Sequence, residues 1–329
     1  MMLLRKIRHR LALLSKTFLF RCGLGTHLLK NRYGERILVF HSIDVKGETK
    51  LNSRYIAQDY FEELLKFFKA HYNVISLDAY YAGDFVPGKL NIAITFDDGL
   101  LNNYELAIPV LEKHNIPATF FITTTLEKKG FLWADFLDLV TLHTAKKEIV
   151  FEGNHYRKNS KNEFSYNGTT LKNRCKYLEY EQITPLFEIF ATEWEAIIAA
   201  DLDIYWKLMS AGQIRKIAKN PLFTIGAHGK THANLVEISI ENALLELRQS
   251  KINLEAIVQK PITDFAFPFG TYTSELVQAA KKEGFSKLLL LDYNNSSDKK
   301  ETVLRNRFVV NPYISKELFL SSLLKGSYR

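Results

Sequence analysis

Short apolar runs alternate with longer segments of helical periodicity over most of the chain. Residues 92–96 form an apolar, β-branched run typical of a buried strand, and residues 103–114 that follow have the spacing of a helix. A second apolar run at 118–123 completes a strand–helix–strand succession, which favours parallel pairing. The alternation predicts an α/β barrel. By the same criteria, helices are expected at 58–70, 239–258, 273–283 and 316–324, and strands at 36–43, 74–77, 264–270, 287–291 and 305–312.

This alternation lapses between residues 131 and 219. The segment holds a polar stretch at 152–173 and helical runs around 177–198 and 203–219. We interpret it as an insertion folded against the mouth of the barrel. From the sequence two roles stay open: the insertion shapes a substrate groove, or it adds helices to the outside.

Composition agrees with a folded enzyme and excludes several other classes. Hydrophobic residues make up 47% of the chain, which is ample for a core. With only Cys22 and Cys175, neither a disulfide framework nor a zinc ribbon is available. The formal net charge is +8, and residues 1–36 hold nine basic residues and one acidic residue, so the rest of the chain is formally neutral. A general nucleic-acid-binding surface on the body is therefore not indicated.

The basic character belongs to an N-terminal arm, residues 1–35. Apolar residues in the arm follow three–four helical spacing with basic residues between them. These residues are Leu4, Ile7, Leu11, Leu14 and Phe18. Charges interrupt the arm too often for it to cross a bilayer, and no secretory cleavage site is visible. The helix either packs on the barrel or anchors residues 1–25 to an anionic membrane surface. We expect a cytoplasmic protein, free or peripheral on the inner leaflet.

Two adjacent carboxylates, Asp97 and Asp98, end the run 92–96 and are followed by Gly99. Carboxylates at the end of a buried strand are costly to desolvate unless a cation compensates them, and a metal ion is the simplest such partner. Neighbouring strand side chains point to opposite faces, so the two should have different roles unless the chain turns between them, which Gly99 permits. Taken alone, Asp-Asp-Gly is also typical of a turn whose carboxylates accept backbone N–H groups.

A second cluster, His228 and His232, follows another apolar run far along the chain. If the turn after that run is helical, both imidazoles lie on one face, and imidazole is the commonest neutral metal ligand. One carboxylate with two imidazoles leaves positions open for water and substrate, as in a catalytic metal site. A further histidine, His41, lies in the run 36–43, near the strand end where barrel enzymes carry functional groups. Taken alone, such histidines are commonly solvated or hydrogen-bonded loop residues.

Both clusters belong to a longer pattern. Residues 95–99 (Thr-Phe-Asp-Asp-Gly), 225–232 (Ile-Gly-Ala-His through His) and 266–270 (Ala-Phe-Pro-Phe-Gly) resemble, in order, three motifs of the polysaccharide deacetylase family, the NodB-like proteins of carbohydrate esterase family 4. The resemblance implies a distorted (β/α)7 barrel with a helical insertion. It places the deacetylase domain at residues 36–329 and the insertion at 131–219.

The resemblance also implies roles for individual residues. Asp98, His228 and His232 would bind a divalent metal ion, with zinc expected, and Asp97 would be the general base. Many members carry a catalytic histidine in a late motif, but no histidine follows residue 232. The poly-N-acetylglucosamine deacetylase branch, which the chain resembles, has one on its first strand instead. His41 is therefore expected to be the general acid.

The third motif departs from the family pattern. Typical members have an arginine where this chain has Ala266, and that arginine contacts the catalytic base. We expect Arg307 to replace it, with Arg305 as second choice, because a neighbouring cation keeps a carboxylate ionised. Pro268 and Phe269 of this motif are expected beside the oxyanion of the reaction.

The expected function is that of a metal-dependent hydrolase that removes N-acetyl groups from an amino-sugar glycan or glycan precursor and releases acetate. Two alternatives remain. Without the motif arginine, the chain could be a weak or silent carbohydrate-binding relative. The same residues could also serve a metal-dependent hydrolase of another amide or ester. No nucleic-acid partner is expected.

Overall fold

A computed structural model describes residues 29, 33–49, 52, 54–125 and 130–328. The predicted amphipathic helix of the N-terminal arm lies outside the described residues. No helix among the described residues is long and apolar enough to span a membrane.

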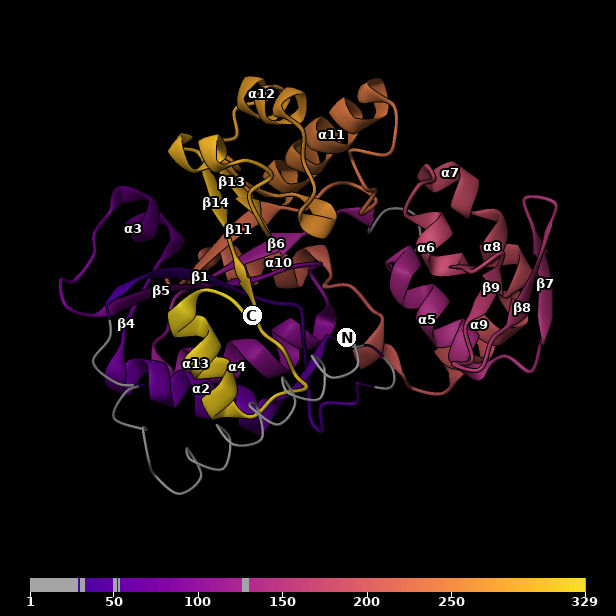
Figure 1. Cartoon of the computed structure of the whole chain (residues 1–329), viewed down its shortest axis with the longest axis horizontal. Helices are drawn as coiled ribbons and strands as arrows, with labels where there is room; N and C mark the ends of the chain where they lie inside the picture. The colour runs from indigo at the N-terminus through magenta and orange to yellow at the C-terminus, as the bar shows by residue number, and fades with distance from the viewer. Residues whose placement is uncertain (1–28, 30–32, 50–51, 53, 126–129, 329) are drawn as a thin grey trace, which may run out of the picture.

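A sheet of parallel strands forms the centre of the molecule (Figure 1). Its order is β14-β13-β12-β11-β6-β5-β1-β15, and β4 pairs with β5 beside this path. The bounds are β1 (Gly34–Phe40), β4 (Asn73–Ile75), β5 (Leu90–Phe96), β6 (Ala118–Ile122), β11 (Phe223–Ala227), β12 (Asp264–Ala266), β13 (Lys287–Leu290), β14 (Leu304–Asn306) and β15 (Phe308–Val309). Two further short strands, β2 (Ser42–Asp44) and β3 (Tyr55–Ala57), pair with each other.

One segment of chain joins the two edges of this sheet. β14 pairs with β13, whereas β15 pairs with β1, where Phe308 lies opposite Leu38. Only Arg307 separates these two short strands. The sheet therefore closes on itself into a distorted barrel, which confirms the predicted fold class.

Helices surround the barrel (Figure 1). They are α2 (Gln58–His71), α3 (Leu77–Ala82), a π-helical turn η2 (Asn103–Ala107) that leads into α4 (Ile108–His114), α10 (Ala211–Lys219), α11 (Ile240–Val258), α12 (Ser274–Lys282) and α13 (Lys316–Lys325), with a short turn η6 (Ser296–Lys300). The helices predicted in the barrel are confirmed, each within two residues of its expected bounds. The strand predicted at 264–270 is shorter, because the chain leaves β12 after Ala266 and forms the turn η5 (Pro268–Gly270).

Alternate residues of a strand face the helices and the barrel interior. On β5, Ile92 and Ile94 belong to the main hydrophobic cluster together with Phe61 of α2. Ala93 belongs to a separate small cluster. Its strand members are Ile37, Phe121, Ala266 and Leu289. Side chains alternate between the two faces of a strand, so Asp97 follows Ala93 on the inner face, at the open end of the barrel.

The segment 131–219 has a hydrophobic cluster of its own, which includes the buried Phe136 and Phe190. It lies to one side of the barrel (Figure 1). Its last helix, α10, instead packs in the main cluster through Ile214 and Ile217, so the part with a separate core ends before α10. Its elements before α10 are α5 (Trp133–His143), β7 (Glu148–Phe151), β8 (Asn154–Lys158), β9 (Phe164–Tyr166), β10 (Thr169–Thr170), α6 (Leu171–Cys175), α7 (Tyr180–Ile183), α8 (Pro185–Ile189), α9 (Ala191–Ala199) and η4 (Asp203–Tyr205).

This segment holds more than the predicted helices. Strands β7 to β10 form a four-stranded antiparallel sheet, and most of it lies in the stretch 152–173 that the sequence analysis described only as polar. Strands this short show too few alternations to stand out from loops.

Candidate active site

Asp97 and Asp98 reach the same site because the chain turns at Asp98. Its backbone adopts φ 76°, and Gly99 follows at φ 81°. A Cβ on Gly99 would lie only 3.0 Å from Cγ2 of Ile122, so close packing as well as backbone conformation favours glycine here. The chain therefore does turn between the two carboxylates, as the sequence allowed. As a result, Nε2 of His228 lies 3.8 Å from Oδ2 of Asp97 and 3.6 Å from Oδ1 of Asp98.

The two histidines come from a loop rather than from a helical turn. β11 ends at Ala227, and residues 228–236 that follow are not helical. Gly229 at φ 77° and His232 at φ 59° bend this loop. The helical turn considered in the sequence analysis is therefore wrong. The loop still brings the two imidazole rings together, with their centres 5.0 Å apart. A non-glycine residue such as His232 adopts the left-handed backbone conformation at a cost in energy, and it does so where surrounding contacts fix the backbone.

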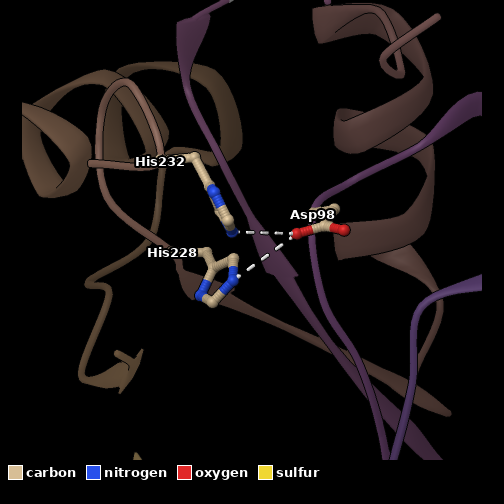
Figure 2. A group of neighbouring side chains, drawn as sticks. All are labelled: Asp98, His228 and His232. Carbon is tan, nitrogen blue, oxygen red and sulfur yellow. Dashed lines mark ion pairs between the residues drawn. The ribbon is translucent and has the colours of Figure 1, made fainter. Parts of the chain in front are cut away.

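Asp98, His228 and His232 offer three ligand atoms that lie within 4.8 Å of one another. Figure 2 shows both imidazoles directed at Asp98, whose Oδ1 is 3.3 Å from Nε2 of His232. Ligand atoms around a tetrahedral zinc ion lie about 3.4 Å apart. Asp98 is fully buried, and within the described residues its Oδ1 has no hydrogen-bond partner. A buried, unpaired carboxylate oxygen facing two imidazoles fits a metal ion.

Hydrogen bonds prepare the histidines for this role. Nδ1 of His228 lies 2.7 Å from the carbonyl oxygen of Ala266, so it carries the proton and Nε2 keeps its lone pair toward Asp98. Burial lowers the pKa of His228, which favours the neutral imidazole that metals bind. The indole nitrogen of Trp133 donates to the carbonyl oxygen of His232.

Glu246 of α11 holds the loop between the histidines. Its carboxylate accepts hydrogen bonds from the backbone nitrogens of Lys230 and Thr231, at 2.7 and 2.9 Å, and from the Thr231 hydroxyl at 2.7 Å. Glu246 falls in the helix predicted at residues 239–258, and nothing in the sequence pattern indicates a role for it. A buried acid on a helix gives no separate pattern, because its partners are backbone groups of a distant loop.

Arg307 contacts Asp97 with two parallel hydrogen bonds of 2.6 and 2.7 Å. Both side chains are almost completely buried. Burial by itself raises the pKa of Asp97, but the charges of Arg307 and His228 and the Arg307 hydrogen bonds hold it below its usual value. Arg305 lies elsewhere, against the ring of Tyr81. The arginine missing at Ala266 thus has a spatial substitute at the seam between β14 and β15.

A second arginine, Arg54, contacts the other carboxylate and was not identified from the sequence. Its guanidinium lies 2.9 Å from Oδ2 of Asp98 and 2.9 Å from Asp135 of α5. Asn52 donates to the same Asp135 oxygen at 2.8 Å. Burial raises the pKa of Asp135 to about 6, against the opposing effect of Arg54. Because Arg54 occupies Oδ2, only Oδ1 of Asp98 faces the imidazoles.

The remaining predicted residues lie around this centre. His41 follows β1, and the charges of Asp97, Asp98 and Arg54 all act on its ring. Burial, assisted by Arg54, lowers the pKa of His41 to about 4, so its imidazole is neutral at pH 7. Phe269, at φ 60°, places its ring 4.8 Å from that of His232, and Pro268 beside it is buried.

The comparisons with known proteins agree with this geometry. The family model for polysaccharide deacetylases matches residues 86–288. Among solved structures, the chain is similar to the deacetylase PplD from Streptococcus pyogenes in complex with acetate (17% identity, TM-score 0.56, 89% of this chain and 98% of that one). It is also similar to BC0361, a polysaccharide deacetylase from Bacillus cereus (19%, 0.55, 88% and 68%), and to IcaB from Ammonifex degensii (16%, 0.53, 90% and 97%). No curated protein matches the chain.

Structural similarity at such low identity shows the shared fold, whereas the family match covers most of the barrel and both acidic and histidine clusters. The chain therefore belongs to the polysaccharide deacetylase family, whose members are hydrolases that act on amide bonds.

Proposed function

We propose that this protein is a metal-dependent deacetylase that hydrolyses the N-acetyl groups of an amino-sugar glycan or glycan precursor and releases acetate. The proposal rests on two adjacent carboxylates whose surroundings suit different roles. Asp98 faces two imidazoles with a free oxygen, while Asp97, its neighbour, is held ionised by Arg307.

Asp98, His228 and His232 would hold the ion, and zinc suits one carboxylate with two imidazoles. When bound, such an ion lowers the pKa of water toward about 7 and polarises an acyl carbonyl. Glu246 and the carbonyl of Ala266 keep the imidazoles directed at the site.

Asp97 would take the proton of the attacking water. Its two hydrogen bonds to Arg307 fix the carboxylate and keep it ionised in the protein interior. Attack on the acetyl carbon places negative charge on the former carbonyl oxygen, and a backbone N–H near Phe269 would stabilise this oxyanion.

His41 would protonate the departing amine. Since its imidazole is neutral at pH 7, it can deliver a proton only after it has received one during the reaction. We propose that this proton is the one that Asp97 removes from water, because both groups lie in the same buried cluster of charges.

Replacement of the base tests the proposal. Asp97→Asn should abolish acetate release from N-acetylglucosamine oligomers, while the metal content of the purified protein stays near that of the native chain. Metal content is measured by elemental analysis beside the acetate assay. Loss of metal in Asp97→Asn would mean that the roles of Asp97 and Asp98 are exchanged. Binding of oligomers without any acetate release by the native protein would favour the silent carbohydrate-binding alternative.

A further inference from the structure

Lys176 lies at the end of α6, over the aromatic side of the candidate active site. Its ammonium is 5.8 Å from the centre of the Phe269 ring, and that ring is 4.8 Å from the imidazole of His232. A single aromatic ring therefore separates this ammonium from a candidate metal ligand. The lysine comes from segment 131–219 and the other two residues from the barrel, so the segment contributes directly to the surroundings of the site.

Lys176 differs from the neighbouring cations because it forms an ion pair with none of the described carboxylates. Lys172 pairs with Asp138 at 2.5 Å, and Arg54 pairs with Asp98 and Asp135. Within the described part of the chain, by contrast, no carboxylate or hydrogen-bond acceptor contacts the Lys176 ammonium, which rests on the Phe269 ring. As far as the described residues go, its three N–H donors are therefore available to a ligand.

The charges around Lys176 favour an anionic ligand. Burial lowers the pKa of its ammonium, and repulsion from Lys172 and Arg54 adds to this effect, with Asp138 opposing it. A divalent ion at the Asp98 site would add further positive charge beyond the Phe269 ring. A negatively charged group placed here would relieve this repulsion, whereas a neutral sugar hydroxyl would not.

We propose that Lys176 binds an anionic substituent, a carboxylate or a phosphate, carried by the glycan beside the N-acetylated sugar. The inference rests on the proposed deacetylase function and adds a substrate class to it: an acidic N-acetylated glycan rather than a neutral one. The anion would accept charge-assisted hydrogen bonds from the ammonium, while Phe269 supplies an apolar surface between this contact and the reacting amide.

Three probes and three variants test this assignment. The probes are a neutral N-acetylglucosamine tetramer, a tetrasaccharide in which N-acetylglucosamine alternates with glucuronic acid, and an N-acetylglucosamine oligomer that ends in a 1-phosphate. The variants are Lys176→Gln, which removes the charge, Lys176→Arg, which keeps it, and Lys147→Gln, which removes an exposed lysine of the same segment as a matched control. Acetate release gives kcat/KM, and calorimetry gives binding.

The native protein should prefer at least one acidic probe. Lys176→Gln should lower kcat/KM for that probe about tenfold, mainly through KM, and leave the neutral tetramer within about twofold. Lys176→Arg should restore most of the loss, and Lys147→Gln should change nothing. A loss confined to one acidic probe identifies the anion as carboxylate or phosphate.

An equal loss on neutral and acidic probes, or a native protein that does not prefer either acidic probe, would overturn the inference. If no probe releases acetate, the proposed function fails. Calorimetry still decides the inference in that case, because acidic probes should bind the native chain more tightly than Lys176→Gln.

Discussion

The buried pair of Asp97 and Arg307 allows a quantitative prediction. Arg307→Met keeps most of the apolar stem but removes both hydrogen bonds and the compensating charge from a carboxylate that is only 3% exposed. Removal of one partner of a buried ion pair costs about 3–5 kcal/mol in the free energy of unfolding, because the other charge is left uncompensated. In an Asp97→Asn background, Arg307 is itself the uncompensated buried charge, and the same substitution removes it, so it should cost less than about 1 kcal/mol. The expected coupling is therefore at least about 2 kcal/mol.

Urea unfolding of the metal-free protein, followed by circular dichroism in the presence of a chelator, measures the four free energies of this cycle. Arg305→Met is the matched control, since Arg305 lies against Tyr81 and its hydrogen bonds within the described residues go to backbone carbonyls. It should change stability by less than about 1 kcal/mol. A cost below about 1 kcal/mol for Arg307→Met, or an equal cost in both backgrounds, would refute the argument that this arginine compensates the buried base.

Three further predictions concern other parts of the molecule. Glu246→Ala should weaken zinc binding about 10–100-fold in competition with a chromogenic chelator, because the histidine loop loses three hydrogen bonds. Glu246→Gln should bind zinc nearly normally, because its amide oxygen can accept from the two backbone nitrogens and its amide nitrogen can donate to the Thr231 hydroxyl. Equal zinc affinities for both variants would contradict this positioning role. The pKa of Asp135 is raised to about 6, so the folded, metal-free protein binds this proton more tightly than the unfolded chain does. The contribution of this group to the free energy of unfolding should therefore fall by about 3 kcal/mol as the pH rises from about 4 to 6. In urea unfolding at a series of pH values, the free energy of unfolding of Asp135→Asn should depend less on pH over this range. Deletion of residues 1–25 should abolish co-flotation with anionic vesicles if the arm is a membrane anchor; equal recovery of both proteins in the soluble fraction would favour packing on the barrel.

Much of the fold follows from local patterns. Apolar runs and helical spacing locate the strands and helices of the barrel within a few residues, since each element's side-chain period reflects which of its faces is buried. The same reasoning located Asp97 and Asp98 at a strand end and His228 and His232 after another. What it could not supply is the local backbone path: the histidines share a site through a left-handed loop, which leaves no periodic trace.

Tertiary structure decided the long-range contacts, although Arg307 had been expected beside Asp97 because of the family resemblance. Arg307 reaches Asp97, 210 positions away, because β14 and β15 pair with opposite edges of the sheet and leave this one residue at the seam. Arg54 and Glu246 have no motif either, since each is defined by a partner on a distant segment. Local sequence patterns located the strand ends that carry the reactive groups. Closure of the barrel decided which cations compensate them, because charge compensation depends on distance in space and not on separation along the chain.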